Sequence, residues 1–297
     1  MPLSHVLLAL SVVVIWGMNF IFIKMSLDEF SPLLLCALRF LLASIPAIFF
    51  IKPPAVPFRI VILYGLVMFA LQFTFLFLGM DVGMTPGMAS LIVQIQVFFS
   101  MFFAAIVLGE KPSLTQVLGA LVAFTGICLV AFHLDKNISI LGFLCIIAAA
   151  ASWGVGNLIT KKMSGVRMFS LVIWGCFVAS FPMVILTLIF EGPASILYSY
   201  HHATWVGVSS LLYTVCISTW IGYGVWNWLI SRYPISQVVP FTLMIPVIGI
   251  ISSILILGES FELWKLISGL LVITGLYINL LNSKFLRLKT TCLSGKR

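Results

Sequence analysis

Long apolar segments alternate with short polar breaks along almost the whole chain. Each segment has roughly 20 residues, and a helix of that length crosses a bilayer core of about 30 Å. Prolines and charges mark the breaks, as at 52–54 (KPP) and 110–112 (EKP). This pattern predicts an all-α polytopic membrane protein with ten transmembrane helices, at 3–25, 31–51, 58–79, 86–107, 113–132, 139–160, 168–190, 203–229, 236–257 and 262–282.

The first apolar segment differs from a cleaved signal peptide. It lacks a basic region in front of its apolar part, and Ser26-Leu27-Asp28-Glu29 follows it in place of a small-residue cleavage site. We therefore expect this segment to be retained as a membrane helix.

The second half of the chain repeats short stretches of the first half. Trp16-Gly17 and the later Lys24 recur 137 residues on, while 108–110 (LGE) recurs 149 residues on as 257–259. An insertion near 198–202 accounts for the difference. Five spans in each half would insert the halves with opposite orientations, as in the inverted repeats of secondary transporters. We expect one repeat over 1–137, a second over 138–283, and a basic cytoplasmic tail at 284–297.

The composition supports a membrane protein and argues against a nucleic-acid-binding one. Hydrophobic residues make up 62% of the chain and charged residues only 8%, which is too little charge to cover a soluble domain. The net charge is +8, but the basic residues stand at segment ends and form no basic face with aromatic residues. Membrane lipid is therefore the expected partner of this charge, and no nucleic acid is predicted.

The distribution of Lys and Arg between alternate breaks predicts the orientation. With the N-terminus inside, the opposite side holds only Lys24, Lys136 and Lys265, and Arg39 lies within a segment. Cytoplasmic loops are enriched in basic residues, so both termini are predicted to be cytoplasmic. The basic residues on that side are Lys52, Arg59, Lys111, Lys161, Lys162, Arg167, Arg232, Lys284, Arg287, Lys289, Lys296 and Arg297.

Motifs of catalysis or metal binding do not stand out in the sequence. We find no nucleophile–base pair, no glycine-rich phosphate loop and no metal-ligand spacing, so we predict no enzyme, no cofactor and no metal site. A membrane-embedded enzyme is the alternative from another class. Such an enzyme would convert its substrate in detergent, whereas a carrier needs a sealed compartment.

The acidic residues all fall in breaks or at segment ends. A proton-coupled multidrug antiporter commonly places a carboxylate in mid-membrane. The sequence therefore disfavours a cationic-drug exchanger and predicts either uniport or proton coupling through another group. The acidic residues are Asp28, Glu29, Asp81, Glu110, Asp135, Glu191, Glu259 and Glu262.

Neutral polar and aromatic residues within the segments are the candidates for a substrate site. Spacings of three and four residues put Trp16 and Asn19 on one helical face, and Trp220, Tyr223 and Asn227 on another. Amides and aromatic rings suit a small zwitterionic molecule. The alternative is that these groups only tie helices together. The candidate substrate-binding residues are Trp16, Asn19, Gln72, Gln94, Trp153, Asn157, Trp220, Tyr223, Asn227 and Pro246.

Four residues within the segments allow more specific predictions about where their side chains or backbone groups lie. Gln94 and Gln96 are two residues apart, about 200° around a regular helix, so only one of them should face a cavity. Pro246 interrupts its segment and frees a backbone carbonyl. Arg39 lies about 12 Å into its segment and should meet water, a carbonyl or a substrate carboxylate.

Several stretches together resemble the EamA family of the drug/metabolite transporter superfamily. They are 16–20 (WGMNF) with Lys24, 39–40 (RF), 86–91 (PGMASL), 108–110 (LGE), 153–154 (WG) with Asn157 and Lys161-Lys162, 222–224 (GYG), Pro246 and 257–259 (LGE). The resemblance implies ten helices with both termini cytoplasmic, and a central cavity lined mainly by spans 1, 3, 4, 6, 8 and 9.

Within that family the resemblance is greatest to bacterial exporters of O-acetylserine and cysteine, at 170–174 (SLVIW) and 274–279 (TGLYIN). It implies an inner-membrane exporter of small metabolites, above all amino acids of the cysteine pathway, that works by alternating access around a midplane cavity. The alternative within transport is a broader efflux carrier for aromatic amino acids or toxic analogues.

Overall fold

The computed structural model describes residues 1–132, 139–163, 165–258, 263–264, 266–271, 273–275 and 277–278, and no strand occurs within them. The α-helices are α1 (Leu3–Leu27), α2 (Pro32–Ile48), α3 (Phe58–Tyr64), α4 (Gln72–Asp81), α5 (Pro86–Ile92), α6 (Gln96–Leu108), α7 (Leu114–Phe132), α8 (Ile140–Lys162), α9 (Met168–Leu186), α10 (Gly192–His202), α11 (Trp205–Leu212), α12 (Gly224–Arg232), α13 (Ile235–Val238) and α14 (Ile245–Leu257). The π-helical segments are η1 (Gly65–Leu71), η3 (Thr187–Glu191) and η4 (Tyr213–Tyr223), and the 3-10 segments are η2 (Val93–Ile95) and η5 (Val239–Met244).

Seven continuous helices in the described part of the chain are long and apolar enough to cross a membrane. They are Leu3–Leu27, Phe58–Asp81, Pro86–Leu108, Ile140–Lys162, Met168–His202, Trp205–Arg232 and Ile235–Leu257. The shorter apolar helices Pro32–Ile48, Leu114–Gly126 and, over its described residues, Leu266–Gly275 fall on the other three predicted segments. The all-helical, multi-pass architecture is thus confirmed, and the count of ten crossings stays a prediction. The predicted tail at 284–297, the break at 133–138, and Glu259 and Glu262 lie outside the described residues.

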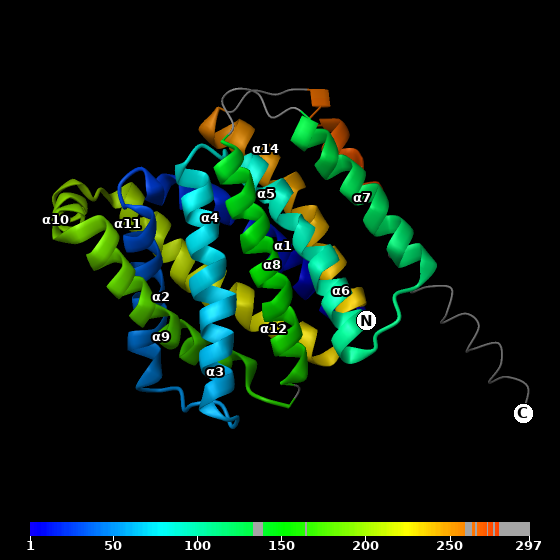
Figure 1. The fold of residues 1–297 in the computed structure, drawn as a ribbon, viewed down its shortest axis with the longest axis horizontal. Helices are drawn as coiled ribbons and strands as arrows, with labels where there is room; N and C mark the ends of the chain where they lie inside the picture. Colours follow the sequence, from blue (N-terminus) through cyan, green and yellow to red (C-terminus); the bar gives the residue numbers. More distant parts are fainter. Residues whose placement is uncertain are drawn as a thin grey trace, which may run out of the picture.

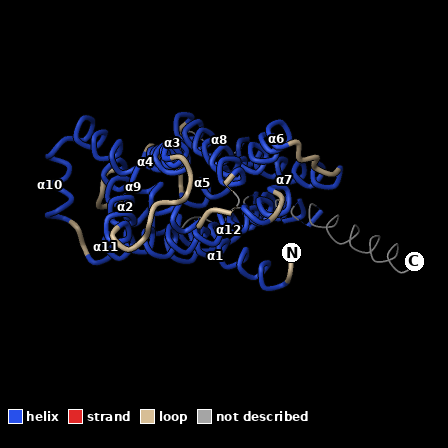
Figure 2. Tube along the Cα trace, turned by 90° about the horizontal axis from the view of Figure 1, so that it is seen from below, coloured by secondary structure: helices blue, strands red, loops and turns tan. Residues whose placement is uncertain are grey.

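The helices pack side by side into a bundle whose links gather at two edges (Figure 1). The link from α2 to α3 and the link from α8 to α9 both lie along the lower edge of that view. Seen from below, the helices lie nearly end-on, with α10 at one end of the bundle (Figure 2). The break left between the predicted segments 168–190 and 203–229 is helical in the structure, and His201 and His202 lie in the last turn of α10. Gly192, the first residue of α10, has φ of 74°, so the helical backbone changes direction there.

Helix ends are set by the residues that mark the breaks in the sequence. Thr85 caps α5, whose first residue is Pro86, and Ser139 caps α8 by accepting from Gly142 N at 3.2 Å. Helices α6 and α14 both end at a left-handed glycine, Gly109 with φ of 66° and Gly258 with φ of 68°. These are the glycines of the two LGE stretches, and a residue with a side chain is strained in this conformation.

The glycine of each Trp-Gly pair packs tightly against a neighbouring helix. A Cβ added at Gly17 of α1 would lie 2.5 Å from the Cβ of Ile248 in α14. A Cβ added at Gly154 of α8 would lie 2.7 Å from the Cβ of Phe99 in α6. Small residues at such crossings allow the dispersion contacts that hold membrane helices together.

A candidate substrate cavity

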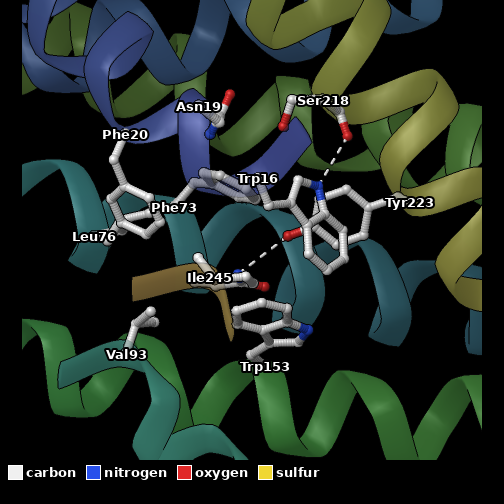
Figure 3. A pocket seen from close by; sticks show the side chains of 11 residues that line it. Trp16, Asn19, Phe20, Phe73, Leu76, Val93, Trp153, Ser218, Tyr223 and Ile245 are labelled. Carbon is white, nitrogen blue, oxygen red and sulfur yellow. Dashed lines mark hydrogen bonds between the residues drawn. The ribbon is translucent and has the colours of Figure 1, made fainter. Parts of the chain in front are cut away.

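A cavity of about 30 Å³ lies inside the bundle, between six helical segments (Figure 3). Its lining comes from α1 (Trp16, Asn19, Phe20), α4 (Gln72, Phe73, Leu76), η2 (Val93), α8 (Trp153), η4 (Ser218, Tyr223) and α14 (Ile245). These segments correspond to spans 1, 3, 4, 6, 8 and 9 of the predicted order. A volume of this size holds about one water molecule, whereas ligand pockets commonly measure about 300 Å³ or more. The cavity must therefore widen before it can accept an amino acid.

Aromatic rings form a large part of the cavity wall, since five of its eleven lining residues are aromatic. Trp16 stands between Trp153 and Tyr223, with ring centroids at 5.2 Å and 4.8 Å. Its indole Nε1 donates to the backbone oxygen of Ser218 at 3.2 Å, which fixes the ring against η4 (Figure 3). The two tryptophans that recur in the sequence thus contact each other at the cavity.

Three buried polar atoms on the cavity wall lack a hydrogen-bond partner. They are Asn19 Oδ1, Gln72 Oε1 and Trp153 Nε1. Leaving a buried polar group unpaired costs about 1–3 kcal/mol, so such groups are uncommon in a purely structural interior. Two acceptors and one donor, set among aromatic faces, offer partners to an ammonium group and to a carboxylate on one small molecule.

Irregular helix geometry brings these groups to the cavity. Gln72 follows directly after π-helical η1, and Tyr223 is the last residue of π-helical η4. The side chains of the two residues meet, with Gln72 Nε2 donating to the Tyr223 hydroxyl at 3.1 Å (Figure 3). Spans 4 and 9 carry 3-10 turns instead, at η2 and η5. π-Bulges occur frequently at functional sites, because they turn side chains away from the regular helical face.

Five of the ten predicted site residues line the cavity: Trp16, Asn19, Gln72, Trp153 and Tyr223. The structure places Gln94, Asn157, Trp220, Asn227 and Pro246 outside it. Six further lining residues were not among the predicted site residues: Phe20, Phe73, Leu76, Val93, Ser218 and Ile245. All of these except Ser218 are apolar, so only Ser218 could have been found by looking for polar residues within the segments.

Neither Gln94 nor Gln96 faces the cavity, and Val93 takes that position instead. Gln94 Nε2 donates to the backbone oxygen of Ser90 at 3.0 Å. Gln96 belongs to a buried polar cluster, in which its Nε2 donates to Thr242 Oγ1 at 2.6 Å and its Oε1 accepts from Asn157 at 3.3 Å. The 3-10 turn at η2 accounts for this, since a tighter helix changes the direction of every side chain after it.

Asn157 is held between helices by neighbours on both sides. Its Nδ2 donates to Ser100 Oγ at 3.0 Å, and its Oδ1 accepts from the indole nitrogen of Trp226 at 3.0 Å. With these contacts α6, α8 and α12 are joined in one buried network. The contacts match the alternative that polar groups tie helices together.

The predicted shared face of Trp220, Tyr223 and Asn227 is divided in the structure. Trp220 Nε1 donates to the backbone oxygen of Ala43 at 2.8 Å, and Asn227 Nδ2 donates to the Tyr64 hydroxyl at 2.7 Å. Only Tyr223 reaches the cavity. The π-helical backbone through Tyr223 explains the difference, because i+5 hydrogen bonding turns the chain less per residue than an α-helix does.

Pro246 lies one residue beyond the cavity wall. It is buried at the start of α14, where the 3-10 backbone of η5 gives way to an α-helix. Its predecessor Ile245 supplies the lining side chain. The proline thus marks a change in helix type at the level of the cavity.

Arg39 is fully buried on α2, directly behind the cavity wall. Its Nε donates to Thr219 Oγ1 at 3.1 Å and its Nη2 to Ser218 Oγ at 3.2 Å. Its guanidinium lies 4.1 Å from the ring centroid of Phe73. Burying a cation in a bilayer without a counter-ion costs about 2.5 kcal/mol or more, which these neutral contacts offset only in part.

Acidic residues at the segment ends act as helix caps. Glu191 accepts from Leu33 N at 2.8 Å and from Leu34 N at 2.9 Å, so its carboxylate closes the N-terminus of α2. Glu29 accepts from Thr204 N at 2.7 Å at the start of α11. Carboxylates at these positions stabilise the positive end of the helix dipole. None of the described acidic side chains lines the cavity.

Contacts at the far end of α12 close the bundle below the cavity. His5 Nδ1 lies 2.5 Å from the Tyr233 hydroxyl, and Lys161 Nζ donates to the Tyr233 backbone oxygen at 2.8 Å. Tyr233 lies ten residues beyond Tyr223, which is about 15 Å along a helix. The start of α1 and the end of α8 are thereby tied to the same turn.

The long apolar helices define a multi-pass membrane protein, and its broken spans meet at a cavity that is the candidate site for a small molecule. The model of the EamA-like transporter family matches residues 3–132 and again 140–281. The chain therefore belongs to the EamA-like transporter family.

Curated relatives cover nearly the whole chain. The "Probable amino-acid metabolite efflux pump" of Escherichia coli (strain K12) is 37% identical over 278 residues, covering 92% of this chain and 93% of the relative. The protein of the same name in Salmonella typhimurium is 38% identical with the same coverage. A "Probable terminal-alkyne amino-acid exporter" of Streptantibioticus cattleyicolor is 24% identical, covering 67% of this chain and 65% of the relative.

A solved crystal structure has the same fold. It superposes with a TM-score of 0.73 at 16% identity, covering 96% of this chain and 99% of that chain. At this identity the likeness supports the arrangement of helices and nothing finer.

Proposed function

We propose that this protein exports small amino acids of the cysteine pathway, O-acetylserine and cysteine, across the bacterial inner membrane by alternating access. The observation that carries the proposal is the set of unpaired polar atoms on the cavity wall, Asn19 Oδ1, Gln72 Oε1 and Trp153 Nε1. A zwitterion can satisfy both kinds of group at once, with its ammonium on the amide oxygens and its carboxylate on the indole N–H. The names of the two relatives at 37% and 38% identity support an amino acid as cargo.

The proposed architecture is two inverted repeats of five helices, ten crossings in all. Paired irregularities support it: π-helix at Gly65–Leu71 and at Tyr213–Tyr223, and 3-10 helix at Val93–Ile95 and at Val239–Met244. The two members of each pair are separated by close to the 149 residues that separate the two LGE stretches in the sequence. Interrupted spans at corresponding positions of two halves are typical of transporter binding sites.

Alternating access gives the contacts at Tyr233 a role in the cycle. In the proposed cycle, the bonds from His5 and Lys161 to Tyr233 close the cavity toward one side and break when it opens there. In this proposal that side is cytoplasmic and holds both termini, which the basic residues of the neighbouring links support. Because acidic groups line no part of the described cavity, the proposed transport is uniport or uses another group for proton coupling.

Transport by purified protein in sealed vesicles tests the proposal. Vesicles loaded with labelled cysteine or O-acetylserine are followed with and without a proton gradient, with phenylalanine as competitor. We expect protein-dependent movement of the first two that phenylalanine leaves unchanged. Empty vesicles and an Asn19→Ala variant serve as controls.

The aromatic wall of Trp16, Trp153 and Tyr223 favours one second candidate, a broader carrier that includes aromatic amino acids. Strong inhibition by phenylalanine, or its own movement, would establish that candidate in place of the first. Absence of movement of all three would contradict both. Turnover of a substrate in detergent would instead establish an enzyme.

A further inference from the structure

Arg39 is the one charged side chain that is fully buried in the part of the chain that the structure describes. Two neutral hydroxyls, of Thr219 and Ser218, accept from its Nε and Nη2. Its remaining terminal nitrogen, Nη1, is buried without a hydrogen-bond partner. The guanidinium thus has one nitrogen with no acceptor as well as an uncompensated charge.

The described residues provide no carboxylate for this cation. The single ion pair among them joins Lys24 to Asp28, at the exposed end of α1. Glu191, on the segment that follows α9, is occupied by the backbone of α2 at Leu33 and Leu34. A buried cation without a counter-ion is typical of a site that receives an anion from outside the chain.

The position of Arg39 relative to the cavity indicates where that anion would come from. Phe73 and Ser218 both line the cavity, and both also contact the guanidinium of Arg39. Arg39 is thus one side chain removed from the cavity. Since the cavity must widen to accept an amino acid, a shift of Phe73 would enlarge it and expose the free nitrogen of Arg39 in the same movement.

We infer that Arg39 binds the carboxylate of the transported molecule when Phe73 moves aside. The inference rests on the proposed function and names the chemistry by which the site selects its cargo. One oxygen of the carboxylate pairs with Nη1 of Arg39, and its other oxygen accepts from the indole N–H of Trp153. The ammonium group faces the free oxygens of Asn19 and Gln72. A ligand that lacks the carboxylate forfeits a charge-assisted hydrogen bond, which is about twice as strong as a neutral one.

Equilibrium binding to the purified full-length protein tests this inference. Two ligand sets are compared, each with an amino acid, its amine analogue and its acid analogue. The first set is cysteine, cysteamine and 3-mercaptopropionate, and the second is phenylalanine, phenethylamine and 3-phenylpropionate. The proteins are wild type, Arg39→Gln, Arg39→Lys and Arg59→Gln, the last an exposed arginine at the start of α3.

We expect Arg39→Gln to weaken binding of the amino acid by about 30-fold and to leave the amine analogue within about 3-fold of its wild-type affinity. Arg39→Lys keeps the charge and should lose less, and Arg59→Gln should bind as wild type does. A purely structural Arg39 would weaken amino acid and amine alike. If Arg39→Gln does not fold, Arg39→Lys and the analogue series on the wild type still give the comparison.

The outcomes separate this inference from the proposed function. If the wild type binds phenylalanine but not cysteine, and phenylalanine binding depends on Arg39, the inference holds and the cysteine-pathway cargo is wrong. If cysteine binds and Arg39→Gln binds it equally well, or if cysteamine binds the wild type as tightly as cysteine does, the inference is wrong and the cargo stands. If the wild type binds neither amino acid, both are wrong.

Discussion

The side-chain amide of Gln72 and the hydroxyl of Tyr223 are joined by a hydrogen bond of 3.1 Å, although the residues are 151 positions apart in the chain. The bond crosses one side of the cavity and connects two spans at the point where each changes between π and α geometry. It leaves Gln72 Oε1 free, because the amide uses its nitrogen for Tyr223. The pair thus orients an unpaired acceptor toward the cavity.

Replacing Tyr223 with Phe removes the acceptor that orients Gln72. We expect the KM for transport to rise by up to about 10-fold, because a lost hydrogen bond is worth about 0.5–1.5 kcal/mol. Vesicle uptake measures the change. Tyr213→Phe is the matched control, since Tyr213 donates to the Ile15 backbone oxygen at 3.0 Å outside the cavity. Equal KM values for the two variants would contradict a role of the Gln72–Tyr223 pair in binding.

The free oxygen of Asn19 predicts a different phenotype from that of another buried asparagine. Asn19→Ala removes an unpaired acceptor from the cavity, so transport should fall while the melting temperature stays the same or rises. Asn227→Ala breaks a bond of 2.7 Å to the Tyr64 hydroxyl outside the cavity, and should cost stability of about 1 kcal/mol. Transport and thermal unfolding in detergent are measured on both proteins. If Asn19→Ala instead lost stability but not transport, and Asn227→Ala lost transport but not stability, Asn19 would not belong to the substrate site.

Glu191 is expected to stabilise the fold without taking part in transport. Glu191→Ala removes the carboxylate that accepts from Leu33 N and Leu34 N, and loss of such a cap costs about 1–2 kcal/mol. The melting temperature should fall, and transport per folded molecule should be unchanged. Asp81→Ala, at an exposed carboxylate at the end of α4, is the control for loss of charge. A transport defect in well-folded Glu191→Ala would instead indicate that this carboxylate carries a proton.

Close helix packing at Gly17 predicts a strong effect of a single methyl group. The added Cβ would lie 2.5 Å from Ile248 Cβ, and overpacking of this kind costs about 1–3 kcal/mol. We expect Gly17→Ala to reduce the yield and the melting temperature of monodisperse protein. At Gly269 an added Cβ meets nothing within 4 Å, so Gly269→Ala should be neutral or stabilising. Wild-type stability of Gly17→Ala would show that α1 and α14 can separate at this point.

Hydropathy, breaks and repeated motifs were sufficient to predict the helical, multi-pass class and most of the helix positions. These features are local, because a segment of about 20 apolar residues has few alternatives to a membrane helix. Spacing also placed Trp16 and Asn19 correctly on one face, since α1 is a regular helix from Leu3–Leu27. The predicted segments 86–107 and 236–257 also end at the two LGE stretches, whose glycines have left-handed backbone conformations in the structure.

Tertiary structure alone decided which polar residues face the cavity. Where a span departs from the α-helix, as at η2 and η4, a count of residues no longer gives the direction of a side chain. Val93 therefore lines the cavity in place of Gln94, and Tyr223 does so without Trp220 or Asn227. The partners of Arg39 come from a span 179 and 180 residues away, and hydrogen bonds of that range are formed only when the helices pack. The sequence by itself determined that there are membrane helices with polar groups in them, and packing between helices determined which of those groups were paired and which were left free.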